Sequence, residues 1–441
     1  MRTERTPMPD PSAIDPLAGR RVLVGISGSI AAVKLPLVVS ALAQRGAQVR
    51  CVLTPSAERL VSPVALAALS RQRCYLEADQ WSAAAERPLH VELAEWAELV
   101  LLAPLSATTL GRWVHGLADT LLASTLLATE APVLAAAAMN TSMWQSPPVC
   151  RNWQLLQAFE RVLPLGPAAG LLACDRLGDG RMAEPALLLL ALESLALWGW
   201  RRDWQGRRLL VTAGPTQEPL DPARCITNGS TGRMGVLLAQ AARLRGAQVA
   251  LVHGPLAVDP AWLSGLQCHP APTAAVMEEA LAALQPGMDA IAMAAAVADH
   301  RRRHPAAHKA SKAELAAALS EGWEPVPDLL AQLVDRRGRH QPILGFAAHS
   351  GDVLAQARDK YRRKGCELLF ANPIDRPGSG FGASGNQGWL LGPADAVTVL
   401  HPAPKLAIAH QLLTALGGLL DTTLKPPGDA PAQAGPAATG P

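Results

Sequence analysis

Two stretches of this sequence share the same order of apolar and polar residues. Residues 21–26 and 208–213 are short, mostly apolar runs, and each leads directly into a turn of small residues, 27–29 in the first case and 214–216 in the second. A helical pattern follows each turn. An apolar run that enters such a turn and then a helix is typical of α/β proteins, so each stretch predicts the start of a parallel sheet.

The helical pattern after each turn ends in the same five residues. Arg45-Gly46-Ala47-Gln48-Val49 ends the first, and Arg245-Gly246-Ala247-Gln248-Val249 ends the second. Glycine adopts the left-handed backbone conformation that terminates a helix, and the next strand pattern begins directly after it. The repeat predicts an α/β fold made of two tandem Rossmann-like doubly wound domains.

Other parts of the chain fit this arrangement. Residues 186–197 predict a helix, and residues 198–206 predict a linker between the two domains. Further apolar runs predict buried strands at residues 99–103, 133–137, 290–294, 343–346 and 368–371.

These elements set the expected domain boundaries. We expect a first domain over residues 20–200 and a second over residues 206–420. Residues 1–19 are polar and predict a flexible N-terminal extension. Residues 421–441 are rich in Pro, Ala and Gly with few large apolar side chains, which predicts a disordered tail.

The composition allows a large core and narrows the classes of function. Of 441 residues, 49% are hydrophobic and 17% are charged, and the formal net charge is only +3. A charge this small gives no case for nucleic acid as a partner. The seven cysteines form no CxxC pair, which is typical of reduced thiols. The N-terminus has no apolar signal segment, and no stretch suits a membrane span, so we expect a cytoplasmic protein.

Polar side chains follow three predicted strands of the first domain. The turn from Gly25 through Ser27 and Gly28 to Ser29 follows the first strand, Thr54 the second and Ser106 a later one. Open parallel sheets bind ligands at these strand ends, and small residues let backbone N–H groups approach an anion. The turn is neither a Walker loop nor GxGxxG, so it favours a mononucleotide phosphate. Glycine-rich turns of this kind also occur without a ligand.

Three more residues of the first domain are candidates for chemistry. His90 precedes a Leu-x-x-Trp-Ala pattern, Asn140 lies between Met139 and Thr141, and Cys174 lies in a glycine-rich stretch. Each also has a structural interpretation. His90 could be an exposed residue at the start of a helix, Asn140 could cap a helix, and Cys174 could be a small core residue. A polar glycine-rich loop is a poor core, which weighs against the last interpretation.

The second domain contains two stretches of small and hydroxylic residues in series. They cover residues 213–224 and 226–235, and the second opens a helix, which suits a nucleotide phosphate. A long surface loop with ordinary cap residues is the alternative. A buried strand then ends near residue 294, and Asp299 and Lys309 follow it.

In this order, and from about residue 20 to about residue 420, the segments resemble the bacterial bifunctional phosphopantothenoylcysteine decarboxylase/phosphopantothenate–cysteine ligase family of coenzyme A biosynthesis. The resemblance implies that His90, Asn140 and Cys174 are catalytic. Asn140 would bind the substrate carboxylate, and Cys174 would protonate the reduced intermediate from a loop that closes over the substrate. It also implies an FMN site formed by Gly25, Ser27, Gly28, Ser29, Thr54 and Ser106.

For the second domain the resemblance implies a ligase that uses CTP and Mg²⁺. The partners would be 4′-phosphopantothenate, which forms an acyl-cytidylate held by Asn228, and cysteine, which displaces CMP. Lys309 would be catalytic by stabilising the transferring phosphate. The implied nucleotide contacts are Met293, Ala294, Ala295, Asp299, Lys309, Pro327, Asp328, Leu329, Leu330, Phe346, Lys360 and Lys364. The sequence identifies no metal ligands.

The chain departs from the family pattern at a few positions. Thr108 replaces an Asn in the flavin half. Val326 replaces an Asn in the ligase half, His349 replaces a Glu, and Ser384 replaces an acidic residue. These departures leave open a flavin-dependent cysteine decarboxylase whose ligase half is inactive.

A non-catalytic regulatory relative is the third hypothesis. The presence of His90, Asn140 and Cys174 argues against it, and Asp299 and Lys309 argue against an inactive ligase half. Family members form trimers of the flavin domain and dimers of the ligase domain. The resemblance therefore implies a homo-oligomer in which FMN sites are shared between subunits.

Overall fold

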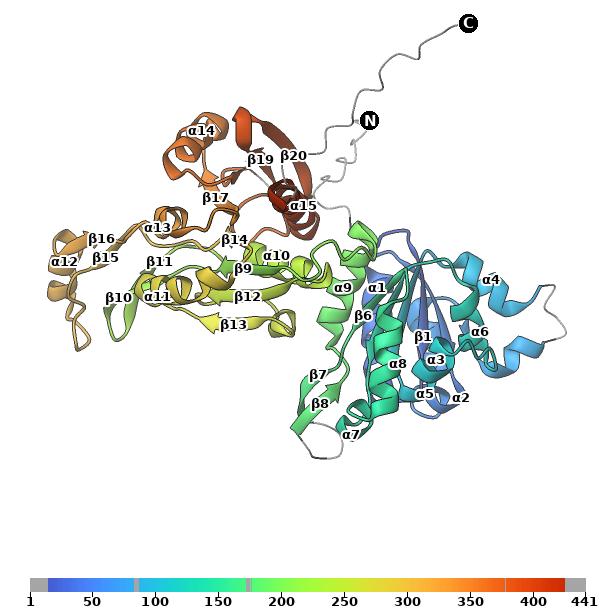
Figure 1. Ribbon diagram of the computed structural model, residues 1–441. Helices are drawn as coiled ribbons and strands as arrows, with labels where there is room; N and C mark the ends of the chain where they lie inside the picture. The colour runs from blue at the N-terminus through green and yellow to red at the C-terminus, as the bar shows by residue number, and fades with distance from the viewer. Residues whose placement is uncertain (1–14, 83–86, 172–174, 176, 377, 425–441) are drawn as a thin grey trace, which may run out of the picture.

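The fold is known from a computed structural model (Figure 1) that describes residues 15–82, 87–171, 175, 177–376 and 378–424. The first domain is built on a six-stranded parallel sheet of order β3-β2-β1-β4-β5-β6. The strands are β1 (Arg21–Ile26), β2 (Gln48–Leu53), β3 (Cys74–Tyr75), β4 (Leu99–Leu105), β5 (Val133–Ala137) and β6 (Val162–Leu165).

Helices cover both faces of this sheet. Val22 and Val24 of β1 belong to one cluster of buried side chains and Leu23 to another, so the two faces of the strand pack into different cores. All seven residues of β4 are buried, as expected for a central parallel strand. The helices are η2 (Ile30–Lys34), α1 (Leu35–Gln44), α2 (Pro55–Glu58), α3 (Pro63–Ser70), η3 (Glu77–Trp81), α4 (Leu89–Trp96), α5 (Ala107–Val114), α6 (Leu121–Ala128), α7 (Thr141–Trp144), α8 (Pro147–Gln157) and α9 (Pro185–Trp198).

The second domain repeats this topology and extends it. Its sheet has the order β13-β12-β9-β14-β17-β18-β19-β20, in which the last two strands are antiparallel. The strands are β9 (Arg208–Ala213), β12 (Gln248–His253), β13 (Gln267–Pro270), β14 (Ala290–Met293), β17 (Ile343–His349), β18 (Leu368–Pro373), β19 (Gly385–Leu391) and β20 (Val397–Pro404). In both sheets the strand order reverses beside the first strand, and ligands bind at such switch points.

Helices again flank the second sheet. They are α10 (Arg233–Leu244), η4 (Pro260–Leu263), α11 (Ala274–Leu284), η5 (Gln285–Gly287), α13 (Leu329–Arg336), α14 (Val353–Lys364), η6 (Pro393–Asp395) and α15 (Lys405–Leu424).

Three antiparallel pairs project from the domains. In Figure 1 the pair β7 (Ala168–Leu171) and β8 (Leu177–Arg181) extends below the first domain beside α7. The pairs β10–β11 and β15–β16 lie with α12 at the far end of the second domain. Their bounds are β10 (Gln217–Asp221), β11 (Arg224–Thr227), β15 (His300–Arg302), β16 (Trp323–Pro325) and α12 (Lys312–Ser320).

The two domains pack on each other through α9, α10 and α15. One cluster of buried side chains runs through both domains and includes Leu187 of α9, Leu237 of α10 and Leu412 of α15. Trp262 of η4 also donates a hydrogen bond from Nε1 to the carbonyl oxygen of Ala186, at 3.3 Å. The domains therefore share a continuous core.

The structure confirms the repeated helix ends and the predicted strands. Gly46 and Gly246 have φ angles of +83° and +100°, so both stop their helices in the left-handed conformation. The strand predictions correspond to β4, β5, β14, β17 and β18, and the predicted helix at residues 186–197 corresponds to α9.

The predictions for the ends of the chain need correction. Residues 15–19 are not part of a flexible extension, because Leu17 is fully buried and Asp15 pairs with Arg45. Residues 421–424 continue α15 instead of starting a disordered tail. Residues 1–14 and 425–441 lie outside the described residues.

Candidate functional site

A cavity of about 530 Å³ opens at the carboxyl edge of the first sheet. It brings together four of the predicted ligand residues, Gly28, Ser29, Ser106 and Asn140, and it also includes Thr108. Most of its other lining is apolar and comes from Ile30, Ala31, Val33, Ala107, Ala138, Met139, Met143, Leu171 and Met182.

Local hydrogen bonds and close packing fix these residues. Ser106 begins α5 and accepts a hydrogen bond from the backbone N–H of Thr109 at 3.3 Å. Asn140 begins α7 and accepts one from the N–H of Ser142 at 2.8 Å, so the cap interpretation of this side chain is confirmed. A Cβ atom on Gly28 would lie 2.4 Å from Ser56 Cβ, which explains the glycine.

Three predicted cofactor ligands do not line this cavity. Ser27 is fully buried, and its hydroxyl donates to the Pro104 carbonyl at 2.6 Å and accepts from the Ser106 N–H at 2.8 Å. Gly25 packs against Leu122, and Thr54 caps α2. Of these residues, Ser27 holds the ends of β1 and β4 together at the edge where the cavity opens.

The remaining predicted residues of the first domain are placed differently. His90 is half-buried on α4 and does not line the cavity. Cys174 lies outside the described residues. Within one chain, the described structure therefore gathers only part of the proposed decarboxylase site.

An ion network at the same cavity has no counterpart among the sequence predictions. Lys34 Nζ donates to both carboxylate oxygens of Glu184, at 2.8 and 2.7 Å, and Arg181 donates to the same carboxylate at 2.6 Å. The hydrogen bond from Lys34 is the main cause that lowers the pKa of Glu184. Lys34 and Glu184 are 150 residues apart, so no local pattern could indicate this pair.

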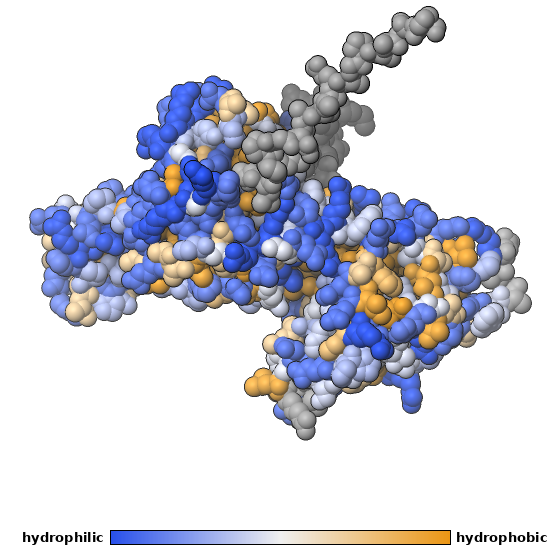
Figure 2. Space-filling view, viewed as in Figure 1, coloured by the Kyte–Doolittle hydropathy of each residue, from blue (hydrophilic) through white to orange (hydrophobic). Residues whose placement is uncertain are grey.

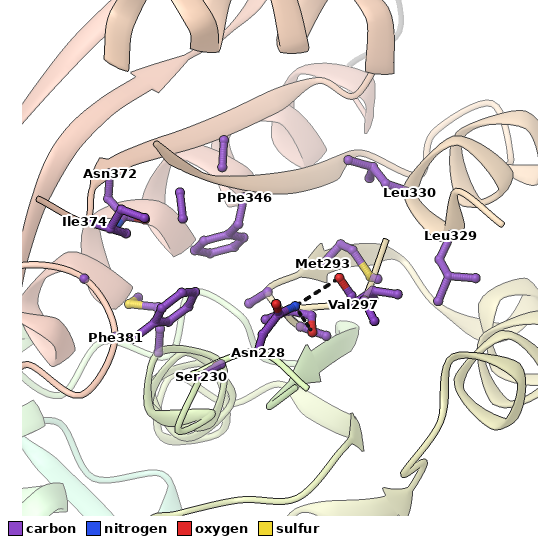
Figure 3. Close-up of a pocket in the computed structure, with 18 of the residues that line it drawn as sticks. Asn228, Ser230, Met293, Val297, Leu329, Leu330, Phe346, Asn372, Ile374 and Phe381 are labelled. Carbon is purple, nitrogen blue, oxygen red and sulfur yellow. Dashed lines mark hydrogen bonds between the residues drawn. The ribbon is translucent and has the colours of Figure 1, made fainter. Parts of the chain in front are cut away.

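A second cavity of about 530 Å³ lies at the carboxyl edge of the second sheet, beside β9 and β14 (Figure 3). It gathers almost all of the predicted nucleotide contacts. The predicted residues that line it are Asn228, Met293, Ala294, Ala295, Asp299, Pro327, Asp328, Leu329, Leu330, Phe346, Lys360 and Lys364.

Two buried threonines hold the loop after β14, which forms one wall of this cavity. Thr212 Oγ1 accepts a hydrogen bond from the N–H of Ala295 at 2.9 Å, and Thr216 Oγ1 accepts one from the N–H of Ala298 at 3.0 Å. The Asn228 amide donates to the carbonyls of Ala296 and Val297, at 3.0 and 3.1 Å, as Figure 3 shows. Both amide protons are then used, so the Asn228 carbonyl oxygen remains as an acceptor for a ligand.

Glycines bring three backbone segments together beside this wall. A Cβ atom on Gly232 would lie 2.2 Å from a methyl carbon of Leu256, and the φ angle of Gly232 is +75°. A Cβ atom on Gly235 would lie 2.6 Å from the carbonyl oxygen of Thr212. The close approach places the N-terminus of α10 at the cavity, where its dipole favours an anion.

The predicted lysine pair lies beside an aspartate. Lys364 forms an ion pair with Asp328. Burial by itself would raise the pKa of Asp328, but the hydrogen bond from Lys364 helps to hold that pKa below its usual value. Lys360 donates to the Phe346 carbonyl at 3.1 Å, and burial, together with the charge of Lys364, lowers its pKa.

Lys309 is the predicted ligase residue that does not line this cavity. It is exposed, between β15 and α12. Of the positions that depart from the family pattern, Val326 lines the cavity and His349 does not. Ser384 lines a neighbouring cavity of about 400 Å³ between the two domains.

Two cations in the wall of the second cavity are not among the site residues predicted from the sequence. Arg233 begins α10 and Lys405 begins α15. Lys405 is only 4% exposed, and burial, with the nearby charge of Arg233, lowers its pKa to about 8. Only the packing of α15 against the sheet brings Lys405 here, and its flanking sequence gives no indication of it.

Within the part of the chain that the structure describes, no three His, Cys, Asp or Glu side chains lie together in a way that could hold a metal ion. Among the same residues, no helix combines the length and the apolar character that crossing a membrane requires.

Models of two protein families match the chain in sequence. The family described as "Flavoprotein" matches residues 12–194, and the "DNA/pantothenate metabolism flavoprotein C-terminal domain" matches residues 204–419.

Solved structures of single domains are similar over parts of the chain. The crystal structure of the C-terminal domain of a CoaBC protein covers 49% of this chain and 99% of its own, with 31% identity and a TM-score of 0.42. A PPC decarboxylase mutant complexed with pantothenoylaminoethenethiol covers 39% of this chain and 94% of its own, with 34% identity and a TM-score of 0.35.

Curated relatives match over most of the chain. The coenzyme A biosynthesis bifunctional protein CoaBC of Bacillus subtilis is 37% identical over 84% of this chain and 90% of its own length. The protein of the same name from Escherichia coli K12 has the same identity and coverage. Since this similarity spans both domains and both cavities, the chain belongs to the family of coenzyme A biosynthesis bifunctional proteins CoaBC.

Proposed function

We propose that this protein is a bifunctional enzyme of coenzyme A biosynthesis. The second domain joins 4′-phosphopantothenate to cysteine with the use of CTP, and the first domain decarboxylates the resulting phosphopantothenoylcysteine. One observation carries the proposal: each of the two domains, in a chain similar to CoaBC proteins throughout, has a cavity at the switch point of its sheet. Sheets of this type bind nucleotides and their analogues at that point.

The first cavity fits FMN in size and lining. Its volume of about 530 Å³ lies in the range of cofactor sites, and apolar side chains would flank a flat ring. Ser29 and Ser106 supply hydroxyl groups at helix starts, where a phosphate is favoured. When bound, FMN supplies the oxidation of the substrate thiol that makes loss of CO₂ possible.

The chain's own residues bind and orient the substrate. The Asn140 amide would hold the carboxylate that is lost, from its place at the start of α7. Met139 and Met143 lie on either side of it in the sequence and also line the cavity. Cys174 would donate the final proton.

In the second domain, Asn228 would hold the acyl-cytidylate and Asp299 would contact the nucleotide. Lys309 would reach the transferring phosphate by a movement of the projecting β15–β16 region, since it is exposed there. Mg²⁺ would be held largely by phosphate oxygens and water, because a single pair of carboxylates, Asp299 and Asp328, lines the described cavity.

The test is reconstitution with the purified protein. Incubation with 4′-phosphopantothenate, cysteine, CTP and Mg²⁺ should give 4′-phosphopantetheine, CMP, pyrophosphate and CO₂, together with a flavin absorption spectrum. Decarboxylation of supplied phosphopantothenoylcysteine without consumption of CTP would reject the ligase half of the proposal. A colourless protein with no activity would reject both halves.

We also infer that copies of the chain associate through the first domain. Ile30 and Val33 line its cavity yet are 57% and 53% exposed, and Leu37 on the next turn is 66% exposed. Apolar residues gather on the visible face of this domain, whereas the second domain is mostly polar in the same view (Figure 2). An exposed apolar face next to a site is typical of a subunit interface. A neighbouring copy could then supply His90.

Mixing of inactive variants tests this shared site. His90→Asn and Asn140→Asp should each abolish decarboxylation when they are alone. If His90 acts in the neighbour's cavity, co-refolded mixtures should recover a measurable part of the wild-type rate, because some sites carry both native residues. No recovery in a mixture that is oligomeric and contains FMN would contradict a shared site.

A further inference from the structure

A single carboxylate beside the first cavity joins two parts of the chain that are far apart in the sequence. Glu184 lies at the N-terminus of α9. Its carboxylate accepts hydrogen bonds from Lys34 Nζ at 2.8 and 2.7 Å and from Arg181 Nη2 at 2.6 Å. Lys34 ends η2, and Arg181 ends β8. Among the described residues, both cations line the cavity and Glu184 does not.

The strand β8 is also attached to α7, which lies beside it in Figure 1. The backbone N–H of Met139 donates to the carbonyl oxygen of Gly180 at 3.0 Å. A Cβ atom on Gly178 would lie 2.4 Å from Thr141 Oγ1, so glycine allows β8 to lie this close to the start of α7. These contacts connect β8 to α7, and the bonds of Glu184 connect it to η2.

Arg181 also ties the two strands of the projecting pair together. Its side chain lies across β7, since a Cβ atom on Gly170 would lie 2.7 Å from Arg181 Nη1. Gly170 is opposite Gly178 in the antiparallel register of the pair. The guanidinium therefore contacts β7 and the Glu184 carboxylate at the same time.

Glu184 differs from an ordinary surface ion pair, which contributes little because water screens its charges and its side chains lose freedom. Two cations share this one carboxylate, and they come from two different elements. The backbone of Glu184 is held by α9, whose Leu187 and Leu188 are buried in the core common to both domains. A carboxylate at a helix N-terminus is also stabilised by the helix dipole. Glu184 is therefore a fixed point to which η2 and β8 are both attached.

We propose that Glu184 is a positioning residue of the decarboxylase site, which holds the pair β7–β8 to η2 through Arg181 and Lys34. The inference rests on the proposed function of the first domain. There, η2 follows the turn that would hold the FMN phosphate, and Cys174 lies between β7 and β8 in the sequence. Since the carboxylate does not line the described cavity, it acts on the reaction through the residues that it holds. Its loss should slow the final proton transfer more than it slows flavin reduction.

Hydrogen–deuterium exchange of the full-length protein with added FMN tests the positioning role. In Glu184→Gln, the amides of β7 and β8 should exchange roughly threefold faster or more, because charge-assisted hydrogen bonds that hold the pair are lost. Asp119→Asn is the matched control, since it removes another partly exposed carboxylate, which pairs with Arg112 at 3.0 Å. Unchanged exchange of β7 and β8 in Glu184→Gln would overturn the proposal.

A double-mutant cycle tests whether Lys34 acts on β8 through the same carboxylate. Lys34→Met should speed the exchange of β8, and adding it to Glu184→Gln should have little further effect, because contacts in one network are not additive. Lys34→Arg should keep exchange near the wild-type rate, since a guanidinium can also donate two hydrogen bonds to a carboxylate. Additive effects of Lys34→Met and Glu184→Gln would contradict a shared network.

The reaction supplies a readout that a general loss of folding would not give. With phosphopantothenoylcysteine, Glu184→Gln should reduce its flavin within roughly twofold of the wild-type rate, while release of 4′-phosphopantetheine should fall roughly tenfold or more. An equal fall in both rates, or loss of bound FMN, would place Glu184 in cofactor or substrate binding and overturn the positioning role. If the wild type reduces no flavin, the proposed decarboxylation fails, and the exchange measurements still decide the role of Glu184.

Discussion

At the scale of single residues, a side chain's hydrogen bonds decide which role it can have. Ser27 and Ser29 are equivalent in the sequence, since both are hydroxyl groups in one glycine-containing turn. In the structure, the Ser27 hydroxyl joins two strand ends through Pro104 and Ser106, whereas Ser29 lines the cavity. Ser27 is therefore suited to stabilising the fold, and Ser29 to binding a ligand.

Substitution of these two serines should separate the roles. Ser27→Ala leaves the Ser106 N–H without its partner and leaves the Pro104 carbonyl with only the backbone N–H of residue 27, so we expect the free energy of unfolding to fall by about 1–3 kcal/mol. Ser29→Ala should leave stability nearly unchanged and weaken FMN binding. Urea denaturation and flavin titration measure the two effects. A stable Ser27→Ala protein that fails to bind FMN would restore Ser27 as a direct ligand.

At the scale of elements, the second cavity depends on how closely α10 approaches β9. Gly235 permits this contact, because a Cβ atom there would lie 2.6 Å from the Thr212 carbonyl oxygen. Thr212 in turn holds the loop after β14 by its hydrogen bond to Ala295. Helix position and cavity wall are therefore coupled through one strand end.

Gly235→Ala should disturb both the position of α10 and the wall of the second cavity. We expect a loss of stability of about 1–3 kcal/mol from overpacking, with weaker CTP binding because the wall moves. Gly338→Ala is the control, since a Cβ atom there meets nothing within 4 Å. Thermal unfolding and CTP titration provide the measurements. Unchanged CTP affinity in a destabilised Gly235→Ala protein would show that the contact does not shape the site.

At the scale of the whole molecule, a buried polar cluster joins the domains. The His410 imidazole of α15 lies 3.0 Å from the Ser194 hydroxyl of α9 and stacks on the Trp198 ring. The backbone carbonyl oxygen of His410 accepts a hydrogen bond from Arg245. Arg245 also pairs with Asp203 of the linker. Burial and the positive charge of Arg245 lower the pKa of His410 to about 3. The imidazole is therefore neutral at the domain boundary.

This cluster predicts loss of stability in acid. Below a pH of about 6.5 the unfolded chain protonates His410 while the folded chain does not, so the stabilisation present above that pH is lost as pH falls toward 3. Between pH 6 and 4, wild-type stability should decline more steeply than that of His410→Gln, by up to about 1.4 kcal/mol per pH unit. The exposed His340 provides a control in His340→Gln. Equal slopes in urea titrations of wild type and His410→Gln would contradict a neutral His410.

Much of the fold could be predicted from local patterns. The alternation of strand, small-residue turn and helix, and the repeated group that ends in Val49 and Val249, indicate two doubly wound domains without any knowledge of contacts. Such patterns are readable because strand burial and helix termination depend on neighbouring residues. For the same reason, the local sequence indicates which strands are followed by polar turns.

The sequence by itself therefore determined the two-domain α/β architecture, the strand ends that carry the cavities, and resemblance to one family. Only the tertiary structure decided that Ser27 is bonded within the protein, that His90 and Lys309 lie away from the cavities, and that Lys405 lies inside one. The physical reason is that burial and pairing depend on residues far apart in the chain. Lys34 with Glu184, and α15 against the second sheet, are contacts of this kind.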